Sequence, residues 1–299
     1  KATTAVRAVY LKNRVAEATG DSKKLWCVAK ELLHTGKDQP VLDVAESQQL
    51  ASSFTSFFSN KLKKIAIDIA SKLISQTASA STLIPKHNTD PFSSFSPVTP
   101  DEVQNMLKSM PAKSSPLDFV PTSLIKSASD IFSHFIANLA NLSSSQGYFP
   151  SGLKTAQVIP LLKKHNLDKD DPSSYRPISN LNTIGKILER LALARLRPHI
   201  FSSLNFSPYQ SAYRTRHSTE TAALKITNDL FTNMDSSHLS LLVSLDLTAA
   251  FDTINHQKLL QRLSSEYGFC SLALKWLETY LVGRTQYVRV GQASGPLTP

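Results

Sequence analysis

The chain has 299 residues, 41% of them hydrophobic and 8% aromatic, which is enough for a buried core in one large or two modest domains. No apolar run approaches the roughly 20 residues that span a bilayer, so we expect no membrane association. The chain begins at Lys1 and no signal pattern follows, so we expect either that its start has been removed or that it is a fragment. The net charge of +10 favours polyanionic partners, although it also suits ordinary solubility. Cys27 and Cys270 lack Cys or His neighbours at metal spacing, which predicts reduced thiols and a nuclear or cytoplasmic location.

The first part of the chain, residues 1–78, is predicted to be a helical region. From Val41 onward an apolar stripe that includes Phe54, Phe57 and Phe58 recurs at the spacing of a long helix. Residues 79–98 are rich in Ser, Thr, Pro and Asn and show little apolar periodicity. We predict a flexible linker and a domain boundary there.

The next segment begins with a strong helix-start signal. Thr99 can cap a helix, Pro100 suits its first position, and Glu102 completes a capping box. A Pro-rich loop follows at 113–121, and a helix from about 129 to 145 should end at Gly147.

A basic hairpin is predicted downstream. Residues 154–162 have the composition of a strand, Lys163 and Lys164 follow, and a returning strand contains Arg176. Lysine supplies a point charge and arginine a fork of donors, so the pair suits a triphosphate. Taken alone, the same pattern also fits a surface hairpin with ordinary lysines.

Residues 208–219 interleave aromatic and cationic side chains. Tyrosine rings can stack on bases while Arg214 and Arg216 meet phosphates. The alternative is a turn that leads to a helix capped by Ser218 or Thr219.

The run Leu241–Leu245 predicts a buried strand that ends on Asp246. A carboxylate there is costly unless it is paired or holds a cation. Phe251 lies on the same corner, before a helical pattern. The alternative is that Asp246 caps that helix and Phe251 belongs to the core. A further helix at 272–281 and a strand at 285–290 are predicted.

Four ordered blocks resemble the reverse transcriptases of non-LTR (LINE-type) retrotransposons, most closely the jockey and chicken-repeat branches. They are Ser173–Leu196, Ser207–Ala222, Leu241–Leu263 and Trp276–Gly291. The resemblance implies an α+β fold: a partial right-hand polymerase, with fingers at about 99–215 and part of the palm at about 216–299, preceded by the helical segment. It also implies RNA template, DNA primer and dNTPs as partners.

Residue roles follow from the resemblance. It implies that Asp246, with the Leu247 carbonyl beside it, is a catalytic ligand of two Mg²⁺ ions. Phe251 would reject a ribose 2′-hydroxyl. The triphosphate of the incoming dNTP would be held by Lys163 or Lys164 and by Arg176. Gln210 and Arg214 would lie near template or nucleotide.

The chain also departs from the family. Ala212 and Ser115 replace usual glycines, which narrows backbone freedom. The family's proline-glutamine-glycine block and its Asp-Asp hairpin are expected after Gly291 and are absent, so we predict a truncated domain without polymerase activity. Two alternatives are a remnant that only binds RNA, and a structural helical protein whose blocks coincide by accident.

Overall fold

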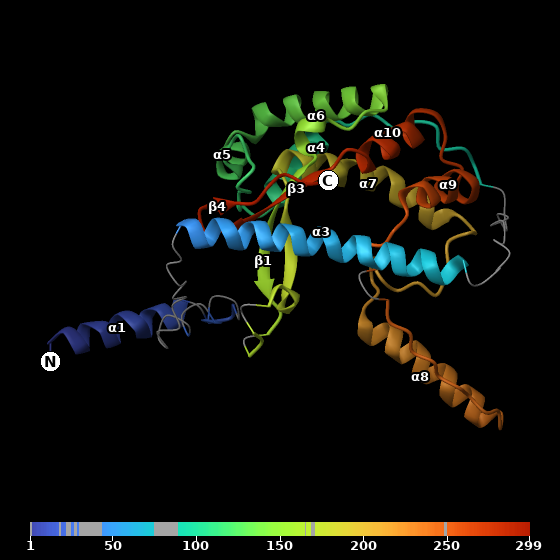
Figure 1. The fold of residues 1–299 in the computed structure, drawn as a ribbon, viewed down its shortest axis with the longest axis horizontal. Helices are drawn as coiled ribbons and strands as arrows, with labels where there is room; N and C mark the ends of the chain where they lie inside the picture. Colours follow the sequence, from blue (N-terminus) through green and yellow to red (C-terminus); the bar gives the residue numbers. More distant parts are fainter. Residues whose placement is uncertain are drawn as a thin grey trace. The chain divides into compact units, whose positions relative to one another are not determined.

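A four-stranded sheet organises the computed structural model, which describes residues 2–17, 19–21, 25–26, 29, 44–74, 89–164, 166–168, 171–247 and 250–299 (Figure 1). The chain divides into two units, Lys1–Asp43 and Val44–Pro299. In the first unit, helix α1 covers Ala2–Glu17. Part of the predicted helical region 1–78, including Cys27, lies outside the described residues.

The second unit mixes helices and strands. The α-helices are α3 (Val44–Ile74), α4 (Pro100–Ser109), α5 (Thr122–Ser127), α6 (Ser129–Gln146), α7 (Thr183–Ser202), α8 (Thr219–Asp235), α9 (His256–Tyr267) and α10 (Ser271–Leu281). The strands are β1 (Thr155–Leu162), β2 (Tyr175–Asn180), β3 (Thr285–Val290) and β4 (Ala293–Ser294), and the short 3₁₀ turns are η1 (Ser151–Leu153) and η2 (Pro172–Ser174).

The sheet has the order β2-β1-β3-β4. Strands β1 and β2 are antiparallel, in a register that pairs Leu161 with Arg176, and β1 runs parallel to β3. The predicted hairpin and the predicted strand at 285–290 are therefore confirmed. Because β1 pairs with β3, elements that the sequence assigns to fingers and palm share one sheet.

Helix α3 covers one face of this sheet (Figure 1). Phe54 and Phe58 pack against Val158 of β1 and Val288 of β3. The Gln48 amide donates a hydrogen bond to the Ser294 carbonyl at 2.8 Å. Strand side chains alternate between faces, so Gln157 and Tyr287 point to the other side, where the Gln157 amide donates to the Tyr287 hydroxyl at 3.1 Å.

A helical core lies beside the sheet. Side chains of α4, α6, α7 and α10 fill it, among them Leu107, Ile136, Ile187, Leu191 and Trp276. Aliphatic side chains at helical spacing explain why these four helices pack together. The described residues include no helix that combines the length and the apolar character needed to cross a bilayer.

The predicted helix boundaries are confirmed where a local signal exists. The Thr99 hydroxyl accepts a hydrogen bond from the Glu102 amide at 3.2 Å and caps α4. Gly147 ends α6 in the left-handed conformation, with φ of 60°. Ser218 caps α8 in a reciprocal capping box with Thr221.

Residues 89–98 differ from the predicted flexible linker, while 79–88 lie outside the described residues. Phe92 forms a bridge with Phe269. The backbone of buried Val98 exchanges two hydrogen bonds with the Asn141 side chain, at 2.7 and 2.9 Å. Phe92, Phe95 and Val98 all contact residues far along the chain. These contacts fix the segment although its Ser and Pro content favours a flexible linker.

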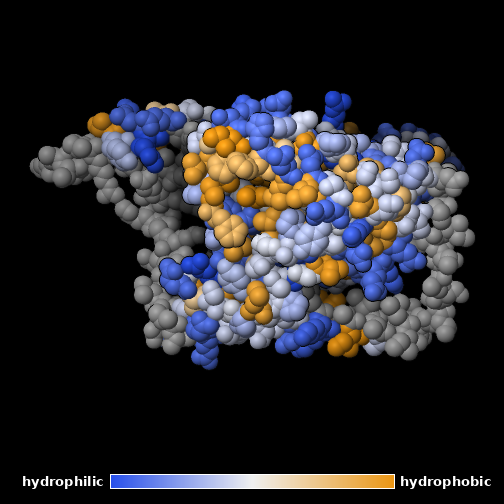
Figure 2. Space-filling model, turned by 90° about the horizontal axis from the view of Figure 1, so that it is seen from above, coloured by the Kyte–Doolittle hydropathy of each residue, from blue (hydrophilic) through white to orange (hydrophobic). Residues whose placement is uncertain are grey.

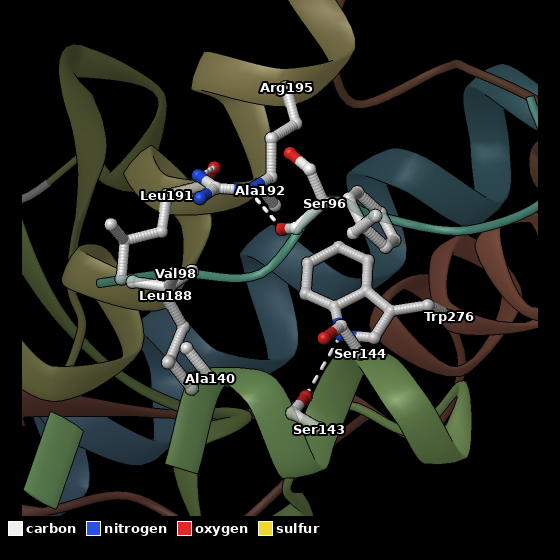
Figure 3. A pocket seen from close by; sticks show the side chains of 11 residues that line it. Ser96, Val98, Ala140, Ser143, Ser144, Leu188, Leu191, Ala192, Arg195 and Trp276 are labelled. Carbon is white, nitrogen blue, oxygen red and sulfur yellow. Dashed lines mark hydrogen bonds between the residues drawn. The ribbon is translucent and has the colours of Figure 1, made fainter. Parts of the chain in front are cut away.

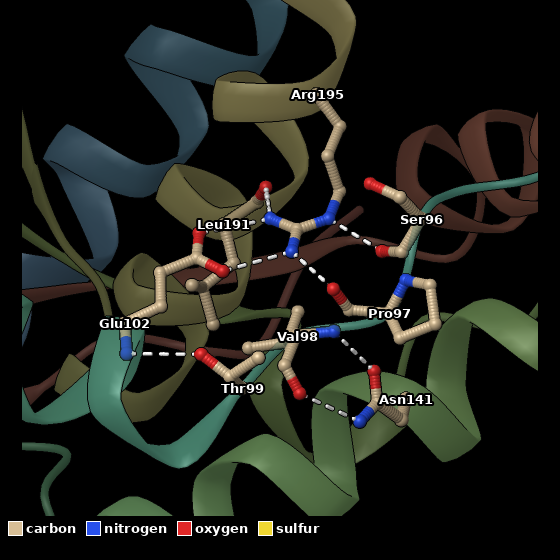
Figure 4. A network of polar contacts seen from close by, with 8 residues as sticks. All are labelled: Ser96, Pro97, Val98, Thr99, Glu102, Asn141, Leu191 and Arg195. Atoms are coloured by element: carbon tan, nitrogen blue, oxygen red, sulfur yellow. Dashed lines mark hydrogen bonds and ion pairs between the residues drawn. The ribbon is translucent and has the colours of Figure 1, made fainter.

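Arg195 of α7 fixes the same segment (Figure 4). Its guanidinium donates to the Ser96 and Pro97 carbonyls and to both carboxylate oxygens of Glu102. The Arg195 side chain is only 11% exposed. One cation thus joins α7, the extended residues before α4, and the first turn of α4.

Candidate functional site

The β1–β2 hairpin presents cations at its end. The Lys163 amide bonds to the Ser174 carbonyl at 3.0 Å, and the Lys163 ammonium donates to the Ser173 carbonyl at 2.7 Å. Lys164 and Arg176 are exposed. Of the three predicted phosphate ligands, Lys163 therefore already bonds a backbone carbonyl, whereas Lys164 and Arg176 face solvent.

An acid lies close to these cations. The hydroxyl and the amide of Ser173 both donate to the Asp171 carboxylate, which lowers the pKa of Asp171 below its ordinary 3.8, and nearby Lys163 lowers it further. Asp171 is therefore ionised at neutral pH. Its charge offsets part of the positive charge of Lys163, so Lys164 and Arg176 carry most of the anion-binding capacity of the hairpin.

One face of the hairpin remains open. Ile159, Leu161 and Ile178 are exposed on the side opposite α3, next to Arg176. Single exposed apolar residues are common, but three on paired strands beside a guanidinium form a surface suited to flat, charged ligands. Ile159 and Leu161 lie in the continuous apolar run Val158–Leu162, so no alternation of polar and apolar residues in the sequence marks them as exposed.

Residues 206–217 form a loop of consecutive turns. The Arg214 guanidinium donates to the Pro208 carbonyl at 3.0 Å and to the Gln210 carbonyl at 3.3 Å, and it lies over the Phe206 ring. The Gln210 amide reaches the Ala212 carbonyl at 3.4 Å. The structure brings Gln210 and Arg214 together, but the hydrogen bonds that their side chains donate go to backbone carbonyls within the same loop. The predicted contact with template or nucleotide stays a prediction.

The predicted strand Leu241–Leu245 is wrong. These residues form no strand, and Leu242 and Leu245 are 65% and 87% exposed. A strand needs a neighbour to pair its backbone groups. The four described strands use their ladders with one another, and Pro177 occupies the outer strand β2, where it cannot donate.

Asp246, which ends that run, is exposed. The expected magnesium site therefore has no strand edge beneath it, and Leu247 beside it is exposed and belongs to no helix or strand. The alternative, that Asp246 caps the next helix, fails as well: α9 begins at His256, and the Asn255 side chain accepts the Lys258 amide at 3.0 Å.

Phe251 has a partner at the candidate site. Its ring is 72% exposed, which rules out the core alternative, and it meets the Tyr213 ring edge to face with centroids 6.2 Å apart. This contact joins the loop at 206–217 to the segment that carries Asp246. Neither segment contacts the hairpin cations through any interaction found among the described residues.

The metal-ligand set is incomplete. The described part of the chain holds no group of three or more His, Cys, Asp or Glu side chains that could bind an ion. Two-ion sites need several carboxylates to offset the charge of the ions. The described residues around Asp246 do not fit such a site.

A polar network that the sequence analysis missed supports the hairpin. The Asp118 carboxylate accepts the Thr183 amide and the Ser115 amide, each at 2.6 Å, and Asn182 caps α7 while its amide donates to the Leu117 carbonyl. The loop at 113–121 is thereby bound to the start of α7, directly after β2. Asn before a helix and Asp in a Pro-rich loop are the available signals.

A small pocket lies apart from all predicted site residues (Figure 3). It is lined by α6, α7, α10 and residues 95–98, and at its floor the Trp276 indole donates to the Ser143 hydroxyl at 2.9 Å. Its free volume of about 20 Å³ suits a water molecule and not a nucleotide.

Comparison with known proteins finds a family match in the C-terminal half of the chain. The reverse transcriptase (RNA-dependent DNA polymerase) family model matches residues 162–297. The chain is 32% identical over 169 residues to the RNA-directed DNA polymerase from mobile element jockey of Drosophila melanogaster, covering 56% of this chain and 18% of that protein. Residues 162–297 are therefore similar to the reverse transcriptases of non-LTR retrotransposons.

Other relatives agree. Identity is 27% over 195 residues to the probable RNA-directed DNA polymerase from transposon BS of Drosophila melanogaster, covering 65% of this chain and 21% of that protein. It is 28% over 211 residues to the Pol polyprotein from type-1 retrotransposable element R1 of Bradysia coprophila, covering 66% and 20%. The chain thus spans about a fifth of the length of these relatives. Every predicted site residue lies within the matched residues 162–297.

Proposed function

We propose that this chain supplies the fingers and part of the palm of an RNA-directed DNA polymerase that extends a DNA primer on an RNA template. The observation that supports this best is the antiparallel β1–β2 hairpin, which holds Lys164 and Arg176 exposed within the segment matched by reverse transcriptases. We place the fingers at about 99–215 and the partial palm at about 216–299. Because α3 packs on the sheet, the upstream helical region joins this module from Val44 onward.

In this proposal the hairpin binds the triphosphate of the incoming dNTP. Arg176 offers a planar fork of donors and Lys164 a mobile charge. Lys163 can exchange its bond to the Ser173 carbonyl for a phosphate oxygen. Phe251, supported edge to face by Tyr213, excludes a 2′-hydroxyl, and the loop that contains Gln210 and Arg214 lies near the template.

The step that joins the dNTP to the primer requires metal ions in addition to the binding residues. Reverse transcriptases as a family use divalent metal ions, which stabilise the charge on the transferring phosphate. We propose that Asp246 and the Leu247 carbonyl contribute to a Mg²⁺ site. The described carboxylates do not complete that site, so we assign the 299-residue chain the binding steps alone.

The first test measures nucleic-acid binding. Fluorescence anisotropy of a labelled RNA–DNA primer-template is followed between about 50 and 200 mM salt. We expect Arg214→Ala and Arg216→Ala, in the loop that we place near the template, each to reduce the slope of log K against log salt by about 0.7–0.9. Lys225→Ala is the matched control, because Lys225 is exposed on α8 and paired with Asp229. Equal losses in all three variants would contradict the proposal.

The second test is primer extension by the same chain with Mg²⁺ and dNTPs. We expect no incorporation above the level without protein. Incorporation that Asp246→Ala abolishes would show that the chain completes the metal site and would overturn the assignment of binding steps alone.

A second candidate, a remnant that only binds RNA, is favoured by the exposed position of Asp246. It predicts that a dNTP complementary to the next template base leaves primer-template affinity unchanged. The polymerase-module proposal predicts tighter binding with that dNTP than with a mismatched one, and loss of the difference in Arg176→Ala.

A further inference from the structure

The outer side of α6 carries an apolar stripe that the proposed function does not use. The inner side packs on α4, α7 and α10 through Ile136, Ala137 and Ala140. The outer residues recur at alternating intervals of four and three residues and are all exposed: Ile131, Phe135, Asn138, Leu142 and Ser145. Ile131, Phe135 and Leu142 are 56%, 68% and 54% exposed. The view toward this side shows hydrophobic side chains gathered on the surface (Figure 2).

Alternating spacing of four and three is the pattern of a helix that packs against another helix. Two of the five seam residues are polar, and a buried Asn such as Asn138, in the middle of the seam, fixes the register of a helix pair. An 18-residue helix is about 27 Å long, so the seam has room for five contact layers but no more.

The charge of α6 selects the kind of partner. From Ile131 to Gln146 the helix contains no Asp, Glu, Lys or Arg, although the chain carries a net charge of +10. A nucleic acid needs cations, so this face does not suit one. An uncharged apolar face suits another protein surface of the same kind.

The two halves of the stripe differ in shape. The N-terminal half projects Ile131 and Phe135, with Leu124 of α5 also exposed nearby in the chain. Beside the C-terminal half lies a groove of about 560 Å³, lined by α6, α10 and residues 94–97, and its walls include Leu142, Ser144, Ser145 and Leu272. A projecting half and a hollow half on one helix are complementary when two copies of the helix meet antiparallel across a two-fold axis.

We propose that this chain forms a two-fold symmetric dimer in which α6 packs antiparallel against α6 of a second copy. In that arrangement Asn138 lies close to the axis beside its own copy. Phe135 packs on Leu142 of the other chain, and Ile131 reaches the groove at Ser145. No like charges oppose one another across the contact, which matters for two copies of a basic chain.

The size of the contact sets the expected affinity. A stripe of about 27 Å by one helix width lies at the low end of specific interfaces. We expect a dissociation constant of about 1–100 μM. The dimer is independent of nucleotide binding, so failure of either proposal leaves the other standing.

The test is sedimentation velocity of the full chain up to about 100 μM, where the weight-average mass should rise from that of the 32.9 kDa monomer toward twice that value. Phe135→Asp should weaken the dimer at least about tenfold, because a charge then enters an apolar contact. Phe231→Asp, on α8, and Leu242→Asp change other exposed apolar residues and should leave the dimer intact. Circular dichroism checks that each variant folds. A monomer at the highest concentration, or equal association of Phe135→Asp and the parent chain, would overturn the proposal.

Cysteine cross-linking tests the orientation in a chain that carries Cys27→Ser and Cys270→Ser. Asn138→Cys should form a symmetric disulfide under mild oxidation. A mixture of Ile131→Cys and Ser145→Cys chains should cross-link to each other, and Ile131→Cys alone should not. Cross-linking of Ile131→Cys to itself would contradict the antiparallel arrangement.

Discussion

Phe54 of α3 and Tyr175 of β2 meet edge to face, with ring centroids 4.9 Å apart and planes at 76°. The contact joins a helix that lies upstream of the family match to the hairpin that carries the predicted nucleotide ligands. Edge-to-face pairs contribute about 0.5–1.5 kcal/mol beyond the area they bury. The position of the hairpin therefore depends on a part of the chain that the family match does not include.

Replacement of Phe54 by alanine should lower the free energy of unfolding by about 3–5 kcal/mol, because the side chain is buried and its loss leaves a cavity between α3 and the sheet. Urea denaturation followed by circular dichroism measures the change. Ile67→Ala on the same helix is the control: Ile67 is 68% exposed, so the expected change is below about 0.5 kcal/mol. Equal effects would show that α3 is not part of the folded unit.

Gly295 provides a second test of the same contact. A Cβ built at this position would lie 2.9 Å from the Ala51 carbonyl oxygen and would collide with the Thr55 hydroxyl. Gly295→Ala should cost about 1–3 kcal/mol of stability, since α3 and the chain after β4 must move apart.

Thermal unfolding of three variants checks this expectation. Thr55→Ala added to Gly295→Ala should restore part of the loss, because only the Ala51 carbonyl then remains in the way. Gly152→Ala is the control, since nothing lies within 4 Å of its built Cβ. A neutral Gly295→Ala would mean that α3 does not press on this turn.

Local signals predicted much of the fold. Thr99, Gly147 and Ser218 mark helix ends through bonds to residues three or four positions away, and such signals are complete within a short window. The hairpin of Lys163 and Arg176 was predictable for the same reason, because its two strands are near neighbours in the sequence.

Features that depend on distant partners could not be predicted. Leu241–Leu245 has the composition of a buried strand, but composition does not supply the neighbouring strand that burial needs. Residues 89–98 hold a fixed conformation because Arg195 and Asn141, which are far along the chain, bond to their backbone. Asp246 shows the same limit: its residue type suits a metal, but the carboxylates that would join it are not among the described residues.

The ion pair between Arg195 and Glu102 should make the free energy of unfolding depend on pH in the acidic range. The hydrogen bond from Arg195 holds the pKa of Glu102 below its ordinary 4.5, with burial opposing it. A carboxyl whose folded pKa is depressed stabilises the protein above its unfolded pKa, and that contribution is lost as pH falls through the folded pKa. Part of the stability should therefore disappear below about pH 4.5. In Glu102→Gln that part of the pH dependence should be absent when urea midpoints at pH 6 and pH 3 are compared.

The guanidinium of Arg195 should contribute more to stability than its positive charge alone, because it also donates to two backbone carbonyls. Arg195→Lys keeps the charge, but one ammonium cannot reach the Ser96 and Pro97 carbonyls and both Glu102 oxygens together. We expect a loss of about 1–3 kcal/mol, because backbone carbonyls that are partly shielded from water lose their donor. Lys225→Ala, which removes an exposed pair on α8, should change stability by less than about 0.5 kcal/mol. If Arg195→Lys proved as mild as Lys225→Ala, the guanidinium would be a surface charge and not the link between α7 and residues 96–102.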